Sequence, residues 1–129
     1  MRVYETVLYA GDAEEAAAFY RDALGLRAIA PPGERAAAFR LDDGGVLLIF
    51  EAETSSAPGR SVPSHGTTGE GHVAFGVERG EMDALRARLE RLGVELEREI
   101  TWPRGGRSVY LRDPAGNSVE LIEGEAWEP

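Results

Sequence analysis

The 129-residue sequence contains no cysteine and no lysine, and its only histidines are His65 and His72. Without cysteine the chain offers no disulfide, no thiolate metal ligand and no thiol nucleophile. Without lysine, Schiff-base chemistry and a P-loop phosphate site are excluded. Chemistry within one chain must therefore use carboxylates, arginines, hydroxyls and at most two imidazoles.

Positive charge is also scarce. The chain has 14 basic residues, all arginine, against 23 acidic ones, and its net charge is −9. We expect no nucleic-acid partner, because such binding needs a basic face. No apolar run approaches the roughly 20 residues of a membrane span, and residues 1–12 lack the apolar core of a signal peptide. The expectation is one cytoplasmic domain with no membrane partner.

Hydrophobic periodicity divides the chain into two similar halves, each predicted to form a strand, a helix and three more strands. In the first half, Asp12 is the expected N-cap and Gly25 the expected stop of a helix over 13–24. The strands of that half are predicted at 3–9, 26–30, 36–41 and 46–51. The second half is predicted to form a helix over 81–92 and strands at 72–77, 94–100, 108–112 and 118–122.

The spacing of the two halves indicates an internal duplication. Glu5 and Gly25 are separated by 20 residues, and His72 and Gly93 by 21 residues. We therefore predict an α+β fold made of two βαβββ modules, residues 1–53 and 71–125, within a single domain over 1–129. Residues 54–70, rich in serine, threonine, glycine and proline, are predicted to be the linker. An ordinary α+β domain with accidental symmetry is the alternative.

Three segments carry a resemblance to a known family: ETVLYAGDAEEAAAFYRDALGL, GHVAFGV and RDPAGNSVEL. Together they resemble the vicinal oxygen chelate superfamily, which includes glyoxalase I, extradiol dioxygenases, fosfomycin-resistance transferases and bleomycin-resistance proteins. The resemblance spans nearly the whole chain. It implies two βαβββ modules whose strands form a cup-shaped mixed sheet around a divalent metal ion, and it implies a homodimer.

The resemblance places four positions where family members hold metal ligands: Glu5, Leu48, His72 and Glu120. His72 and Glu120 are usual ligand types, Glu5 stands where the family most often has histidine, and Leu48 cannot ligate. One imidazole and two carboxylates suit Zn²⁺, Ni²⁺, Mn²⁺ or Fe²⁺ and leave coordination positions open for substrate. Glu51 is expected on the opposite face of its strand from Leu48.

Simpler interpretations of the same residues stay open. His72 at a strand start is compatible with a satisfied surface histidine. Glu120 lies in an apolar strand, where a buried carboxylate needs either a metal or an arginine partner. Glu5 is alternatively exposed, or a general base in a site without metal. His65 in the linker is either a solvated histidine or a lid residue over the site.

On the substrate side, Ser108 and Tyr110 precede Glu120 by twelve and ten residues. The fosfomycin-resistance members have serine and tyrosine at these separations in their substrate site, so both are implied substrate contacts. Tyr9 is expected to share a strand face with Glu5. The loop 102–107 supplies Trp102 and Arg107, and arginine forks suit carboxylate or phosphate recognition.

The sequence also departs from specific members of the family. Val7 and Pro129 stand where the fosfomycin enzymes have threonine and arginine, and Leu48 argues against glyoxalase I itself. The resemblance therefore implies a metal-dependent, glyoxalase- or dioxygenase-like enzyme that stabilises an enediolate or oxyanion of a small substrate, with Glu5 and Glu120 as catalytic carboxylates. The alternative is a bleomycin-resistance-like protein that sequesters a small molecule without catalysis.

Overall fold

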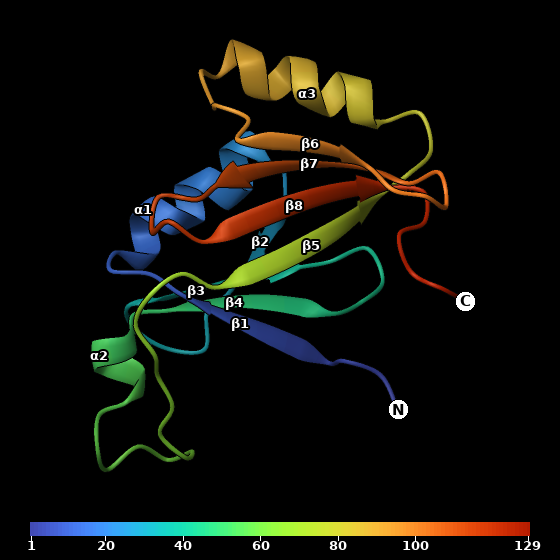
Figure 1. Cartoon of the computed structure of the whole chain (residues 1–129). Coiled ribbons are helices and arrows are strands. Elements are labelled where there is room, and N and C mark those ends of the chain that lie inside the picture. The colour runs from blue at the N-terminus through green and yellow to red at the C-terminus, as the bar shows by residue number, and fades with distance from the viewer.

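The two halves of the chain fold into the same succession of elements (Figure 1). The computed structural model describes residues 1–129. The first half forms β1 (Glu5–Tyr9), α1 (Ala13–Ala18), β2 (Arg27–Ile29), β3 (Ala36–Arg40) and β4 (Val46–Phe50). The second half forms β5 (His72–Val77), α3 (Met82–Arg91), β6 (Arg98–Thr101), β7 (Arg107–Arg112) and β8 (Ser118–Glu123). A short helix, α2 (Ala52–Ser55), follows β4 in the connecting segment.

Each half contributes one four-stranded sheet. The strand orders are β1-β4-β3-β2 and β5-β8-β7-β6. In both sheets the first strand of the half pairs in parallel with the last strand, and the remaining pairs are antiparallel. The equal topologies confirm the predicted α+β architecture of two repeated βαβββ modules. They also leave β1 and β5 as edge strands, the strands that carry Glu5 and His72.

The first helix begins where its cap predicts and ends in a wider turn than expected. The Asp12 carboxylate accepts hydrogen bonds from the backbone N–H groups of Glu14 and Glu15, both at 3.0 Å. A π-helical turn over Phe19–Ala23 then replaces the final α-helical turn of the predicted 13–24 helix. This turn keeps both Tyr20 and Ala23 buried. Gly25, with a φ of 71°, ends the helix as predicted.

The strand predicted over 94–100 is shorter in the structure, since β6 begins only at Arg98. Its ladder with β7 starts where Arg98 lies opposite Tyr110. Val94 and Leu96, which supplied the apolar signal, pack against the core from an irregular stretch. Apolar alternation therefore identified buried positions correctly without identifying the strand start.

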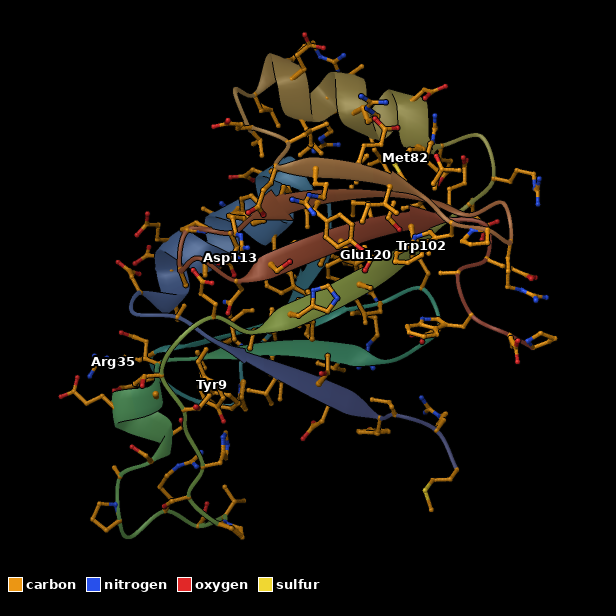
Figure 2. The ribbon with its side chains drawn as sticks, in the orientation of Figure 1. Tyr9, Arg35, Met82, Trp102, Asp113 and Glu120 are labelled. Carbon is orange, nitrogen blue, oxygen red and sulfur yellow. The ribbon has the colours of Figure 1, made fainter.

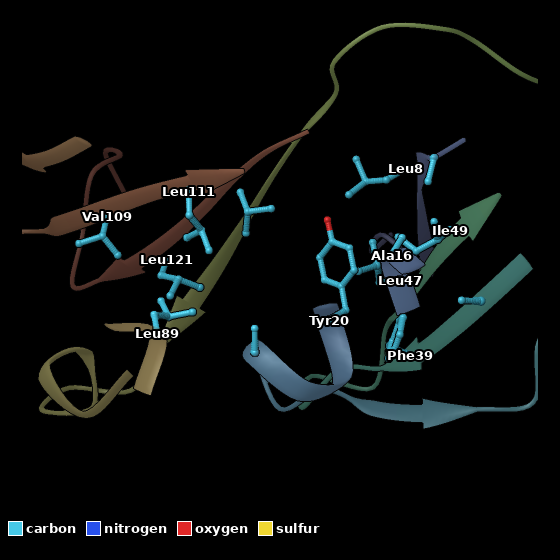
Figure 3. Packing of buried hydrophobic residues seen from close by; sticks show 14 of the residues in the cluster. Leu8, Ala16, Tyr20, Phe39, Leu47, Ile49, Leu89, Val109, Leu111 and Leu121 are labelled. Carbon is cyan, nitrogen blue, oxygen red and sulfur yellow. The ribbon is translucent and has the colours of Figure 1, made fainter. Parts of the chain in front are cut away.

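One hydrophobic core joins the two modules (Figure 3). It is built from one face of each sheet and from the inward sides of α1 and α3. Its fully buried members include Tyr20 of α1, Leu47 of β4, Leu89 of α3 and Leu111 of β7. Complete burial of such a side chain contributes about 1.5–3 kcal/mol. Because each sheet uses one face for this core, the other face of each sheet is turned away from it.

The face of the first sheet that points away from this core is also apolar. A second cluster of four buried residues lies there: Ala38, Val46, Leu48 and Phe50. Leu48 thus lies among hydrocarbon neighbours at the position of a family metal ligand. No helix in the structure has the length and apolarity needed to cross a membrane.

Candidate functional site

The outward face of the second sheet brings several of the predicted site residues together. Along β5, His72 alternates with partly buried residues, so its imidazole lies on the exposed side. Glu120 lies in the middle of β8, opposite Ala74 of β5 and Tyr110 of β7. The two neighbouring strands reduce the exposure of Glu120 to 7%. Figure 2 shows Glu120 and Trp102 on this sheet, while Tyr9 lies on the other sheet.

The side chains of His72 and Glu120 converge at one point. Nδ1 of His72 lies 3.1 Å from the carbonyl oxygen of Ser118. A carbonyl only accepts, so Nδ1 carries the hydrogen and the lone pair of the neutral ring is at Nε2. That Nε2 atom lies 3.4 Å from Oε2 of Glu120. Two electron-pair donors therefore face the same space, an arrangement that a shared cation satisfies.

The other carboxylate oxygen of Glu120 is already occupied. The Ser108 hydroxyl donates a hydrogen bond to Oε1 over 2.5 Å. The same hydroxyl accepts a hydrogen bond of 2.7 Å from Nε1 of Trp102. Ser108 is completely buried, so the bond that it donates to Glu120 is shielded from water. Glu120 is held in one orientation, with Oε2 left to face His72.

Tyr110 lies beside His72 and Glu120. Its ring stacks on the His72 imidazole, with centroids 6.4 Å apart and an interplanar angle of 21°. Burial, and after it the contact with the Glu120 carboxylate, raises the pKa of the Tyr110 phenol above its ordinary value. Tyr110 is therefore a neutral hydroxyl near physiological pH, able to donate a hydrogen bond beside the His72–Glu120 pair.

The donor pair fits a divalent metal ion, although one chain alone does not complete a site. Two ligand atoms bound to one ion at about 2.1 Å in tetrahedral geometry lie about 3.4 Å apart, the spacing seen between His72 and Glu120. His72 also has the carbonyl partner on its second ring nitrogen that metal-bound histidines usually have. However, the chain contains no group of three or more His, Asp or Glu side chains placed to hold a metal. Glu5, exposed at the start of β1, does not join the pair.

Tyr9 and His65 form a separate pair on the first sheet. The Tyr9 hydroxyl lies 2.6 Å from Nδ1 of His65, and the imidazole packs edge-on against Phe50 with centroids 5.0 Å apart. The backbone N–H of His65 donates to the Ser55 carbonyl. His65 is therefore docked on the sheet end rather than loose in the linker. A hollow of about 310 Å³ opens beside Tyr9, and neither His72 nor Glu120 lines it.

Two further charged residues have partners elsewhere. Arg107 lies on the opposite side of β7 from Ser108, where its guanidinium contacts Asp83 at 2.9 Å and Glu123 at 3.6 Å. Glu51 accepts two hydrogen bonds of 3.1 Å from Arg35. The structure thus places Arg107 apart from the His72 group and leaves Glu51 without access to it.

Sequence reasoning named Trp102 and Ser108 separately and missed the bond between them. The signal was available in the strand pairing, because Thr101 and Arg107 lie opposite one another across the β6–β7 hairpin. Trp102 therefore lies opposite Gly106, two positions before Ser108, so Trp102 and Ser108 lie diagonally across the hairpin on the same face. Without the register of these two strands, a hydrogen bond between the indole of Trp102 and the hydroxyl of Ser108 cannot be inferred.

Comparisons with known proteins agree with this fold. The family model described as the Glyoxalase/Bleomycin resistance protein/Dioxygenase superfamily matches residues 2–121. A lactoylglutathione lyase of Haemophilus influenzae is 31% identical over 132 residues, covering 98% of this chain and 95% of the relative. A metallothiol transferase FosB of Shouchella clausii is 34% identical over 59 residues, 44% of this chain and 40% of the relative.

The solved structures extend the similarity to the complete fold. The crystal structure of a lactoylglutathione lyase from Agrobacterium tumefaciens matches with a TM-score of 0.90 and 39% sequence identity. The match covers 99% of this chain and 97% of that chain. Both modules, and therefore the strands that carry His72 and Glu120, lie inside the matched region.

Proposed function

The chain belongs to the glyoxalase/bleomycin resistance protein/dioxygenase superfamily, and from that premise we propose that it is a metal-dependent enzyme acting on a small substrate with neighbouring oxygen atoms. The observation that carries the proposal is the convergence of His72 Nε2 and Glu120 Oε2 at 3.4 Å. No arginine or lysine neutralises this buried carboxylate, so a cation is its natural partner.

Glu5 supplies the third ligand in this proposal, and it comes from a second copy of the chain. Glu5 and His72 lie on β1 and β5, the edge strands of two separate sheets, and no triad forms within one chain. In a homodimer with two-fold symmetry, Glu5 of each copy reaches the His72–Glu120 pair of the other. One imidazole and two carboxylates make a formally neutral site with Zn²⁺, Ni²⁺, Mn²⁺ or Fe²⁺.

The proposed mechanism divides the work between carboxylates. His72, Glu120 and the Glu5 of a second copy would hold a divalent ion, which would supply electrophilic stabilisation of negative charge on a substrate oxygen, as in an enediolate or oxyanion. Glu120, fixed by Ser108, stays in place throughout. Glu5 of the second copy, exposed on its strand, would leave the metal to take the substrate proton as general base. Tyr110 keeps its proton and donates a hydrogen bond to a substrate oxygen, and His65 with Tyr9 contacts the distal part of the substrate.

Metal analysis tests the proposal directly. Protein prepared without added metal and then loaded with each of the four ions is expected to bind about one ion per chain. Glu120→Gln keeps the shape of the side chain but removes its charge, so it should weaken binding by at least tenfold. Glu90→Gln, an exposed residue of α3, is the charge-matched control. Failure of all four ions to bind stoichiometrically would overturn the proposal.

A mixing experiment tests whether the site spans two copies. Glu5→Ala and Glu120→Gln should each abolish tight binding when purified alone. If the site lies between copies, mixed dimers of the two variants contain one intact site, and an equal mixture recovers about a quarter of the wild-type sites. A site within one chain recovers none. A monomer in sedimentation at micromolar concentration would also contradict this arrangement.

A second function is favoured by the apolar outward face of the first sheet. Ala38, Val46, Leu48 and Phe50 form a buried cluster there, and such a face suits an aromatic ligand held without catalysis. In that case the chain is a small-molecule sequestering protein. Aromatic ligands would then bind with an affinity that a chelator does not change, whereas the enzyme proposal requires chelator sensitivity.

For the enzyme proposal, the names of the relatives make lactoylglutathione formation the first activity to assay.

A further inference from the structure

We propose that Trp102 is a positioning residue that acts through Ser108 to set the orientation of the Glu120 carboxylate. This inference rests on the proposed metal site, since the carboxylate being oriented is one of its ligands. Trp102 itself is not expected to touch the metal. Its indole N–H binds Ser108 at 2.7 Å, and the Ser108 hydroxyl binds Glu120 at 2.5 Å.

The direction of these bonds follows from the groups themselves. An indole N–H only donates, so the Ser108 oxygen must accept from Trp102. The hydroxyl has a single hydrogen, and an ionised carboxylate only accepts, so that hydrogen points at Oε1 of Glu120. Trp102 thus removes the freedom of the hydroxyl to rotate away. Consecutive bonds of this kind polarise one another inside a buried site.

Fixing Oε1 determines what the other oxygen does. With Oε1 engaged, Oε2 is the free atom, and it lies 3.4 Å from Nε2 of His72. The carboxylate therefore offers one oxygen to a metal ion rather than two. Ser108 and Glu120 are 0% and 7% exposed, so water does not compete for the bonds that hold this orientation.

The position of Trp102 is itself fixed by backbone contacts at the end of the β6–β7 hairpin. Its N–H donates to the Gly106 carbonyl at 2.7 Å, and its carbonyl accepts from Gly105 at 2.9 Å. The N–H of Gly106 then donates to the carbonyl of Glu125 in the C-terminal segment. A Cβ atom at Gly106 would lie only 2.5 Å from that Glu125 oxygen. Hydrogen bonds within the turn and a contact with the C-terminal segment therefore hold the backbone of Trp102 in place.

A double-mutant cycle on metal affinity tests the inference. The probe is whichever of Zn²⁺, Ni²⁺, Mn²⁺ and Fe²⁺ the wild-type chain binds stoichiometrically, measured by competition with a chelator. Trp102→Phe keeps the ring and removes the N–H, and it should weaken binding about tenfold, the lower end of the effect of outer-shell partners. Ser108→Ala should weaken binding by tenfold or more. Trp127→Phe, 85% exposed, is the matched control and should have no effect.

The two effects should not add. If Trp102 acts only through Ser108, the double variant binds metal as Ser108→Ala does, within about twofold. Ser108→Thr retains the hydroxyl and should restore most of the affinity. Thermal unfolding of each variant separates loss of the relay from loss of the fold. Unchanged affinity in Trp102→Phe, or fully additive losses in the double variant, would overturn the inference.

A measurement without metal checks the same relay. The chain has two tryptophans, so its indole N–H groups give two resolvable NMR signals. The Trp102 signal should exchange with solvent at least tenfold more slowly than the Trp127 signal, and Ser108→Ala should abolish the difference. Fast exchange at Trp102 would contradict this inference alone. Absence of metal binding by the wild-type chain would instead overturn the proposed function and this inference with it.

Discussion

The side-chain amide of Asn117 donates a hydrogen bond to the backbone carbonyl of Tyr9, 3.0 Å away and 108 residues earlier in the chain. Its amide oxygen accepts from the N–H of Gly71 at 2.7 Å, just before β5. Its second amide hydrogen goes to Asp113 at 2.9 Å. One side chain therefore ties the end of β1, the start of β5 and the β7–β8 turn together, and it fixes the two modules relative to each other.

Replacing Asn117 by alanine should destabilise the protein by about 3 kcal/mol. Asn117 is 1% exposed, and its loss leaves the Tyr9 carbonyl and the Gly71 N–H without partners, each worth about 1–3 kcal/mol. Urea denaturation measures the change in the free energy of unfolding. Ser61→Ala, at an exposed linker position, should change it by less than 0.5 kcal/mol. A loss below 1 kcal/mol in the Asn117 variant would show that the modules do not depend on this contact.

Tyr20 gives the protein a specific weakness at alkaline pH. Its hydroxyl donates to Asp113 at 2.7 Å, and burial, then the Asp113 contact, raises the pKa of Tyr20 above its ordinary value near 10. The neutral hydroxyl is thus favoured in the folded state. Its stabilising contribution is complete below about pH 10. It is lost above that pH, because the unfolded chain then releases the proton that folded Tyr20 retains.

The comparison of wild type with Tyr20→Phe isolates this contribution. At pH 8 the variant should be less stable by about 2 kcal/mol, the value of a hydrogen bond to a charged group. Between pH 8 and pH 11 the difference should shrink by about 1.4 kcal/mol. Tyr4→Phe, which alters an exposed tyrosine, should show no such trend. A difference that stays constant to pH 11 would mean that Tyr20 ionises as it does in the unfolded chain.

Most of the fold was predictable because its signals are local. The N-cap at Asp12, the helix stop at Gly25 and the alternation of apolar residues are properties of short segments, and the duplication repeats such segments. The role of Asn117 in joining the modules could not be predicted in this way, because its partners lie 46 and 108 residues away, and no local pattern encodes such contacts.

Only part of the candidate site could be predicted from the sequence, for the same reason. Strand alternation predicts Ser108 and Tyr110 on one face of their strand, whereas only the register, with Tyr110 opposite Glu120, adds Glu120 to that face. The ion pair of Arg107 could not be predicted, because its partner Asp83 is brought to it by the packing of α3. The separation of Glu5 from His72 depended on how the two sheets are arranged, a property of the whole core.

Gly106 should tolerate no side chain, whereas Gly76 should. An added Cβ at Gly106 would lie 2.5 Å from the Glu125 carbonyl oxygen, and at Gly76 it would meet no atom within 4 Å. We expect Gly106→Ala to cost about 2 kcal/mol, as overpacking does, and to increase proteolysis of the C-terminal segment. Gly76→Ala should be neutral or slightly stabilising. Equal thermal stability of the two variants would contradict the close approach of the hairpin and the C-terminal segment.

Tyr9 should matter for the segment that carries His65 and not for metal binding. Tyr9→Phe removes the 2.6 Å bond to His65, worth about 1 kcal/mol, so hydrogen exchange at the His65 N–H should accelerate about fivefold. Metal content should stay at the wild-type level, because the Tyr9 hydroxyl bonds to His65, which is not one of the proposed ligands. For an active preparation, we expect a raised KM with unchanged kcat, the signature of lost substrate binding. Tyr4→Phe is the matched control. If Tyr9→Phe lowered the metal content instead, the assignment of Tyr9 and His65 to the substrate side would be wrong.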